Sequence, residues 1–221
     1  MKYIGITQRL IRHTAYNEIR ECLAQDWGEF FACELKDFLP LPLSYGIDFS
    51  RYAPFLSGVI LSGGNDLGMF CDDGLSQIRD NYEYTLIKYC MKHNIPLLGV
   101  CRGAQILAYF FDSTLKACSG HTQAHLVYSA TSKFYVNSFH RYCITHLGAD
   151  LIELAAAKRC DCGEQSLDSH QYSIEGFKHK SGAFFGIMWH IERERGLENT
   201  EILDSYLECV KKFKENKQQR R

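Results

Sequence analysis

The sequence has no long apolar run and almost no excess of charge of one sign. Its opening residues, Met1–Thr7, form a short apolar stretch that meets polar residues at once, too brief for a signal peptide core or a membrane span. We therefore expect a cytoplasmic protein with no membrane contact. The formal net charge of −1 provides no field that would hold a polyanion, so nucleic acid binding is not expected.

Internal repeats and low-complexity stretches are also missing, which excludes solenoids and disordered tracts. Hydrophobic residues make up 46% and charged residues 23% of the 221 residues, a composition typical of globular proteins. This length favours a single domain over residues 1–221. The last stretch, residues 211–221, is rich in Lys and Arg, and we expect it to fray into solvent rather than bind phosphate.

A metal site of the usual zinc pattern is not evident, although the chain has ten cysteines. Cys160 and Cys162 could form half of such a site, but no second closely spaced Cys or His pair completes it. We interpret this segment as a surface loop. The cysteines are spread through a chain with a large expected core, so we expect reduced thiols and neither a metal nor any other cofactor.

Short apolar runs alternate with helical patterns through most of the chain. This alternation predicts an α/β fold: an open, mostly parallel sheet flanked by helices, with sites beyond the carboxyl ends of its strands. The second half is richer in β-like runs, which indicates antiparallel additions to the sheet. Strands are predicted at residues 3–6, 38–42, 58–61, 97–100, 126–128, 134–136 and 183–188, and helices at about 16–33, 76–93, 102–110 and from 200 onward.

Cys101 lies at a predicted junction between a strand and a helix. Gly99 and Gly103 flank it at two residues on either side, which removes side chains that would clash in a sharp turn. The helix that follows directs free N–H groups and the positive end of its dipole toward the sulfur, which favours a thiolate. Cys101 is therefore the candidate nucleophile, whereas a buried structural role is the simpler interpretation of the other nine cysteines.

A thiolate nucleophile needs donors for the oxyanion that forms on attack. Glycines at the end of the predicted strand 58–61 would free backbone N–H groups for this purpose. We predict a hole made by the backbone N–H groups of Gly64 and Arg102. The alternative is that residues 62–65 form only a tight turn.

These motifs resemble those of class I glutamine amidotransferases, in the Cys-Arg-Gly form seen in γ-glutamyl hydrolases. The segment Gly99-Val-Cys101-Arg-Gly103-Ala-Gln105 resembles the nucleophile motif, and Leu61-Ser-Gly-Gly-Asn-Asp66 resembles the oxyanion strand. Residues 79–83 resemble the helix that precedes the nucleophile strand, and residues 189–192 resemble the family's Trp-His-Pro-Glu. The motifs stand in family order between about residues 55 and 192. The resemblance implies the fold of that superfamily, with a flavodoxin-like core.

The resemblance also supplies the remaining members of a catalytic triad. It implies that His190 is the general base and acid, and that Glu192 orients its imidazole. The chain has Ile191 where the family usually has proline. Proline would stiffen the turn between His190 and Glu192, so its replacement by Ile191 affects how firmly the Glu192 side chain is positioned.

Further pocket residues follow from the resemblance. Gln105 and the segment Asn137, Ser138, Phe139 and His140 are similar to residues that contact the glutamyl group. His121 and His125 resemble a histidine pair near the pocket of γ-glutamyl hydrolases, although a flexible surface loop explains them equally well. Two histidines alone do not fill a coordination shell, so no metal is assigned to them.

The resemblance implies hydrolysis of a γ-glutamyl amide through a thioester on Cys101. The Cys-Arg-Gly form favours a hydrolase that acts alone on a small γ-glutamyl conjugate, such as γ-glutamyl-CDP-amidate in capsule phosphoramidate synthesis or a γ-glutamyl polyamine. One alternative is the glutaminase subunit of an amidotransferase that passes ammonia to a separate synthase partner. The other is a binding module without catalysis, against which the intact Cys101, His190 and Glu192 argue.

Overall fold

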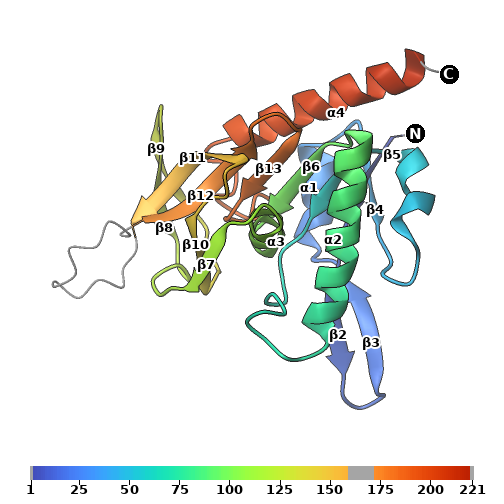
Figure 1. Ribbon diagram of the computed structural model, residues 1–221, viewed down its shortest axis with the longest axis horizontal. Coiled ribbons are helices and arrows are strands. Elements are labelled where there is room, and N and C mark those ends of the chain that lie inside the picture. The colour runs from blue at the N-terminus through green and yellow to red at the C-terminus, as the bar shows by residue number, and fades with distance from the viewer. Residues whose placement is uncertain (1, 159–171, 220–221) are drawn as a thin grey trace.

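The computed structural model describes residues 2–158 and 172–219. At one end of the sheet, five strands run parallel to one another in the order β4 (Leu39–Pro42), β1 (Tyr3–Ile6), β5 (Leu56–Leu61), β6 (Leu97–Val100) and β13 (Phe184–Ile187). These strands have short apolar sequences, and β5, β6 and β13 are buried along their whole length, as in parallel sheets covered on both faces. The predicted open parallel sheet is confirmed (Figure 1).

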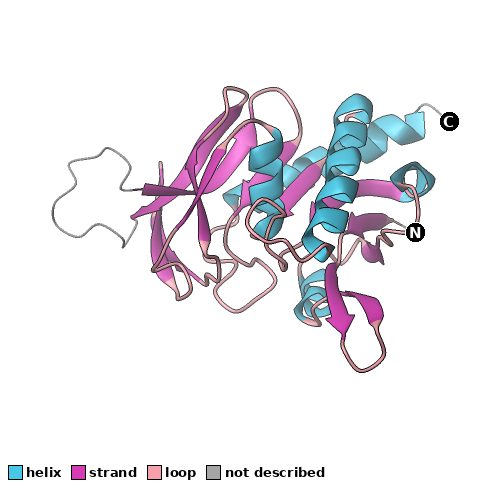
Figure 2. Ribbon diagram, turned by 60° about the horizontal axis from the view of Figure 1, so that its bottom comes forward, coloured by secondary structure: helices cyan, strands magenta, loops and turns pink. Residues whose placement is uncertain are grey.

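Beyond β13 the sheet continues with antiparallel strands, which confirms the predicted additions. The path runs through β12, β11, β8 and β9, and β10 pairs with both β12 and β7. Figure 2 shows this group of strands in magenta on the left, away from the two chain termini. Of these strands, β8 and β9 had been predicted, whereas β7, β10, β11 and β12 had not. Their bounds are β7 (Thr114–Ala117), β8 (His125–Ser129), β9 (Lys133–Val136), β10 (Tyr142–His146), β11 (Leu151–Lys158) and β12 (Tyr172–His179).

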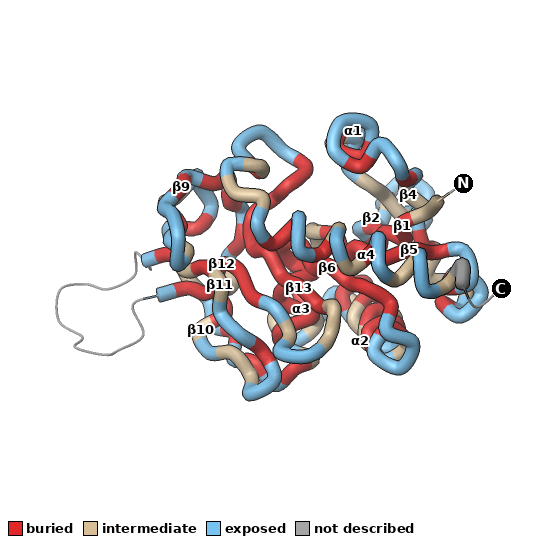
Figure 3. Tube along the Cα trace, turned by 90° about the horizontal axis from the view of Figure 1, so that it is seen from above, coloured by how far each residue is buried: buried red, intermediate tan, exposed pale blue. Residues whose placement is uncertain are grey.

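Helices bury the two faces of the parallel strands in separate hydrophobic clusters. One cluster contains side chains of α1 (Asp26–Cys33) and α4 (Glu201–Gln219), and the other contains side chains of α2 (Leu75–His93) and α3 (Arg102–Phe110). Figure 3 shows the buried strands β6 and β13 between these layers. Two 3₁₀ turns, Phe49–Arg51 and Ala53–Phe55, precede β5. None of the helices in the described ranges is long and apolar enough to cross a bilayer.

The helix predicted over residues 16–33 is wrong in its first half. There the chain forms an antiparallel hairpin of β2 (Arg9–His13) and β3 (Glu18–Cys22), and only α1 is helical (Figure 1). Asn17 has φ 46° in the turn between the two strands, a conformation that a helix excludes. Most side chains of β3 are exposed, so the apolar spacing there does not mark the buried face of a helix.

The prediction that residues 211–221 fray is also wrong for the part that the structure describes, because α4 continues to Gln219. Lys217 anchors this end of the helix. Its ammonium donates hydrogen bonds to the carbonyl oxygens of Ala53, Pro54 and Leu56, at 3.2, 2.8 and 3.3 Å. The basic tail therefore contributes to the tertiary structure.

The expectation that all cysteines are reduced is wrong for one pair, Cys118 and Cys143, which form a disulfide. Antiparallel pairing of β7 with β10 brings their Cα atoms to 5.9 Å, although they are 25 residues apart in sequence. Six other cysteines, among them Cys101, are free thiols. Cys160 and Cys162, interpreted above as part of a surface loop, lie outside the described residues.

Candidate active site

Cys101 lies between the end of β6 and the start of α3, in a sharp turn. Its backbone has φ 53° and ψ −109°, which a non-glycine residue adopts only when the surrounding structure holds it there. A Cβ on Gly99 would lie 2.4 Å from the carbonyl oxygen of Gly103, and a Cβ on Gly103 would lie 2.0 Å from that of Leu61. Both flanking glycines are therefore required by the close approach of α3 to β5 and β6.

His190 follows β13, which is the parallel neighbour of β6 in the sheet. The carboxyl ends of these two strands therefore bring His190 and Cys101 to the same edge of the sheet. The imidazole lies close enough to the Cys101 sulfur for the two groups to interact, and it hydrogen-bonds to Glu192. The distance from His190 Nδ1 to Glu192 Oε1 is 2.7 Å. Because a carboxylate only accepts, Nδ1 carries the proton and Nε2 is left for the sulfur. Ile191, which replaces the family proline, is buried in the core, and the contact between His190 and Glu192 is made without proline.

The environment of His190 favours its protonated form. Burial lowers the pKa of this histidine, but hydrogen bonds to Cys101 and Glu192 and the charges of both outweigh burial and raise the pKa from 6.5 to about 9. At neutral pH the imidazole therefore holds a proton that it can give to a leaving nitrogen. The same imidazole can accept a proton from water once that nitrogen has left.

Replacing Glu192 with glutamine is expected to move the alkaline limb of the pH profile. The wild-type kcat/KM is expected to fall above about pH 9, where His190 loses the proton that it donates. Without the carboxylate charge, the pKa of His190 decreases, and the limb is expected to move down by about one pH unit or more. The measurement is kcat/KM between neutral and alkaline pH, with Glu194→Gln, an exposed neighbour, as control. Identical alkaline limbs in the variant and the wild type would refute this role of Glu192.

The strand that precedes the predicted oxyanion hole ends against His190 and Cys101. A Cβ on Gly63 would lie 2.8 Å from Cε1 of His190, so only glycine fits there. Gly64 has φ 85°, and a Cβ there would lie 2.8 Å from the Arg9 side chain. Together with Cys101 and Arg102, Gly64 lines a cavity of about 320 Å³. The backbone atoms predicted to stabilise an oxyanion thus belong to residues around the same cavity as the sulfur.

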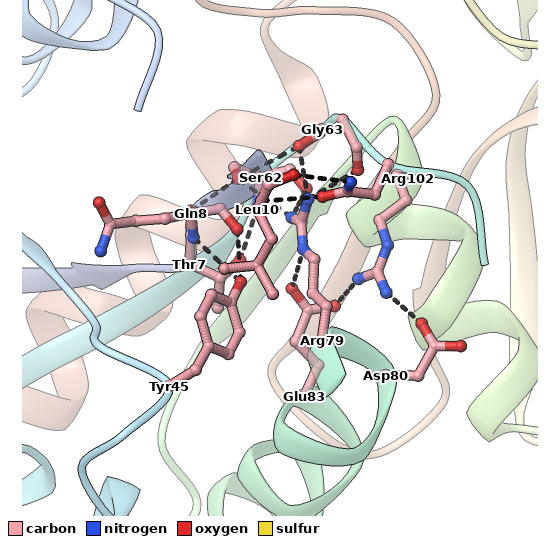
Figure 4. Close-up of polar contacts among 12 residues, drawn as sticks. Thr7, Gln8, Leu10, Tyr45, Ser62, Gly63, Arg79, Asp80, Glu83 and Arg102 are labelled. Atoms are coloured by element: carbon pink, nitrogen blue, oxygen red, sulfur yellow. Dashed lines mark hydrogen bonds and ion pairs between the residues drawn. The ribbon is translucent and has the colours of Figure 1, made fainter. Parts of the chain in front are cut away.

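Arg79 of α2 holds this strand end in place, a role that the sequence analysis did not identify. Its buried guanidinium donates to the carbonyl oxygens of Ser62, Gly63 and Gly64 at 2.6, 2.9 and 2.6 Å (Figure 4). Glu83, one helical turn later, accepts from Arg79 Nε at 3.0 Å. Because three successive carbonyl groups are bound from one side, the orientation of their peptide units is fixed.

The side chain of Arg102 takes part in the same buried network. Its guanidinium is ion-paired with Glu83 and Asp80, both on α2 (Figure 4). The side chain therefore points away from the nucleophile into the interface between α2 and α3, and only its backbone N–H is a candidate donor to an oxyanion. Buried ion pairs of this kind fix geometry even where they add little net stability.

The predicted glutamyl-binding residues divide into two groups. Gln105, Phe139 and His140 line the cavity that holds Cys101. Asn137 instead binds the backbone next to the triad: its Nδ2 donates to the carbonyl oxygens of His190 and Glu194, both at 2.8 Å, and its Oδ1 accepts from the N–H of His190 at 2.8 Å.

Ser138 likewise makes a contact within the protein. Its buried hydroxyl donates to the carbonyl oxygen of His121 at 2.6 Å. His121 and His125 lie close together, and both face the carboxylate of Glu175 on β12. The structure therefore joins the two histidines of the predicted pair, and it adds an acidic residue that the sequence analysis had not considered.

Two arginines that the sequence analysis missed also line the cavity. Arg9 comes from the β2–β3 hairpin and Arg141 from the segment before β10, and both are exposed. No sequence signal singled them out, because neither belongs to a motif. They bring positive charge to a lining that also holds the exposed carboxylates of Asp66 and Asp73.

The fold is that of class I glutamine amidotransferases, as predicted. Among solved structures, the chain resembles a glutamine amidotransferase from Thermotoga maritima, with a TM-score of 0.61 and 17% identity over 98% of this chain and 85% of that one. A glutamine amido transferase from Methylobacillus flagellatus gives a TM-score of 0.58 and 14% identity over 88% and 72% of the two chains. At these identities the likeness concerns the fold.

Sequence comparison narrows the class to a family. The peptidase C26 model matches residues 3–131. The gamma-glutamyl-CDP-amidate hydrolase of Campylobacter jejuni is 50% identical over 210 residues, which cover 95% of this chain and 99% of that protein. The chain belongs to the peptidase C26 family.

Proposed function

We propose that this chain is a thiol hydrolase that cleaves γ-glutamyl-CDP-amidate into glutamate and the free CDP-amidate. The observation that supports this chemistry is the position of Cys101, in a strained turn beside His190. The Nδ1 atom of His190 lies in turn 2.7 Å from Glu192 Oε1. The substrate is inferred from the 50% identity with the Campylobacter jejuni enzyme over nearly the whole length of both chains.

The first half of the proposed reaction forms a thioester. The Cys101 sulfur attacks the δ-carbonyl carbon of the glutamyl group, and the carbonyl oxygen becomes an oxyanion that accepts from the backbone N–H groups of Gly64 and Arg102. When the tetrahedral intermediate collapses, the C–N bond breaks. His190 gives its proton to the departing nitrogen, so the amidate leaves with a neutral amino group on phosphorus.

The second half releases glutamate. His190, now neutral, accepts a proton from a water molecule as the water oxygen attacks the thioester carbon. The C–S bond then breaks, the sulfur leaves as a thiolate, and the acid product diffuses away. One water is consumed for each amide bond, and the Cys101 and His190 pair returns to its starting protonation.

The residues around the cavity suit the two ends of this substrate. Gln105 is held by a 2.9 Å hydrogen bond from Nε2 to the carbonyl oxygen of Tyr142, which leaves its amide oxygen for the α-ammonium of the glutamyl group. The nucleoside diphosphate carries negative charge, and Arg9 and Arg141 are the cationic side chains of the cavity lining that reach solvent.

The test is glutamate release from γ-glutamyl-CDP-amidate, a γ-glutamyl polyamine and glutamine, each with the purified chain alone. We expect kcat/KM for the CDP-amidate conjugate to exceed the other two values by roughly 100-fold, because only that substrate has a diphosphate that can pair with the arginines. Arg141→Ala is expected to raise KM for this conjugate about tenfold and to leave glutamine hydrolysis unchanged. Equal kcat/KM values for all three compounds, or activity on glutamine alone, would refute the proposed substrate.

A further inference from the structure

A buried cluster of three histidines and one glutamate lies next to the active-site cavity, and the proposed reaction does not use it. His121 comes from the segment between β7 and β8, and His125 is the first residue of β8. His140 comes from the segment before β10, and Glu175 from the middle of β12. Glu175 and the side chains of His121 and His140 are almost completely buried. Residues from three separate parts of the chain therefore converge on one carboxylate.

Each of the three histidines has a ring nitrogen at a distance from one oxygen of Glu175 that is typical of two ligands of the same zinc ion. His121 Nδ1 lies 3.3 Å from Glu175 Oε1, and His125 Nε2 and His140 Nε2 lie 3.5 and 3.4 Å from Glu175 Oε2. Ligands that are about 2.0–2.1 Å from a zinc ion in tetrahedral geometry are separated from each other by about 3.3 Å. The ligand atoms of His121, His125 and Glu175 all lie within 4.8 Å of one another.

The hydrogen bonds of the rings indicate which nitrogens carry lone pairs. His140 Nδ1 lies 3.1 Å from the carbonyl oxygen of Tyr142, and His125 Nδ1 lies 3.4 Å from that of Gln123. A carbonyl oxygen only accepts, so each Nδ1 carries the proton and each Nε2 of a neutral ring presents a lone pair to Glu175. Metal-binding histidines are commonly oriented by such contacts with backbone carbonyls.

With neutral rings and no cation, this arrangement would bring lone pairs together. Two ring nitrogens and a carboxylate, all acceptors, would face one another in a buried place. Both ring nitrogens of His121 and Nε2 of His125 are buried and make no hydrogen bond within the described residues. Unpaired polar atoms of this kind are costly to bury, whereas a bound cation would satisfy them. Ser173 supports the carboxylate, since its hydroxyl donates to Glu175 Oε1 at 2.6 Å.

We propose that His121, His125, His140 and Glu175 bind one zinc ion. The sequence alone offered only the pair of His121 and His125, because Glu175 and His140 join it through the tertiary structure. Four protein ligands leave no open position, so the ion is structural. It ties the segment that carries Phe139, His140 and Arg141, a wall of the active-site cavity, to β12.

The test uses tag-free protein purified without chelators or thiol reductants. We expect about one zinc per chain by elemental analysis. A chelator is used to prepare the zinc-free protein. Adding zinc back to a concentration of about 100 times its Kd is expected to raise Tm by roughly 5–10 °C above that of the zinc-free protein. His125→Ala and Glu175→Gln are each expected to weaken zinc binding at least about 100-fold. His93→Ala, an exposed histidine on α2, is the matched control and should bind zinc as the wild type does.

Cobalt substitution separates this site from a neighbouring one. Cys118, Cys143 and His140 also lie within 4.8 Å of one another, and reduction of the disulfide would free two thiols. Cobalt at the proposed site should give a tetrahedral visible spectrum without a thiolate charge-transfer band. Such a band, a chain that binds no zinc, or wild-type affinity in folded His125→Ala and Glu175→Gln would each overturn the proposal. If circular dichroism shows that either variant is unfolded, the test is the Tm of the wild type with and without zinc, and an unchanged Tm would overturn the proposal.

Discussion

Replacement of Cys101 with alanine is expected to lower kcat for γ-glutamyl amide hydrolysis by at least about 10⁴-fold, because no thioester can form. The substitution removes only the sulfur, and alanine can occupy the same turn, so binding of the substrate should change little. Calorimetric titration of the variant with γ-glutamyl-CDP-amidate, together with glutamate release, separates the two effects. A pronounced fall in kcat with an intact Kd is the expected result.

Cys71 provides a matched control for this experiment. It is a free thiol that lines the same cavity as Cys101, but it does not follow a strand of the central sheet. Cys71→Ala is therefore expected to retain at least about half of the wild-type kcat, as expected for a substitution outside the catalytic unit. If turnover survives in Cys101→Ala and is lost in Cys71→Ala, the nucleophile is Cys71 and the assignment to Cys101 is wrong.

The parallel core and the position of Cys101 could be predicted because their signals are local. The strands at 3–6 and 97–100 are short apolar runs, and a glycine on each side of Cys101 marks a sharp turn. A Cβ added to Gly99 or Gly103 would lie only 2.0–2.4 Å from a backbone oxygen, so no other residue fits at either position.

Features that depend on contacts between distant segments could not be predicted. Arg79 reads as one charged residue of an amphipathic helix, and only the packing of α2 under β5 shows that it binds three carbonyl groups. Glu175 lies in a strand with no distinctive pattern, and its histidine partners are 35 to 54 residues away in the chain. The β2–β3 hairpin was not predicted because its apolar residues are spaced as in an amphipathic helix, although most side chains of the hairpin are exposed.

His190→Ala is the second change with a large expected effect, again a fall in kcat of at least about 10⁴-fold. The imidazole supplies the proton for the leaving nitrogen and then accepts one from water, so both halves of the reaction lose their proton carrier. Its loss also leaves Glu192, which is buried, without its partner at 2.7 Å. His93→Ala, on the exposed surface of α2, is the control and should keep wild-type kcat.

The double variant Cys101→Ala/His190→Ala tests whether the two residues act as one unit. If His190 works only through the sulfur and the thioester, removing it after Cys101 is gone should cost less than about tenfold more. The expected result is a kcat for the double variant close to that of Cys101→Ala alone. Multiplied effects, with the double variant slower by the product of the two single losses, would mean that His190 acts on the substrate independently of Cys101. The thioester route would then be wrong, since in that route His190 passes its proton to the leaving nitrogen, and later accepts one from water, only after the sulfur has attacked the substrate.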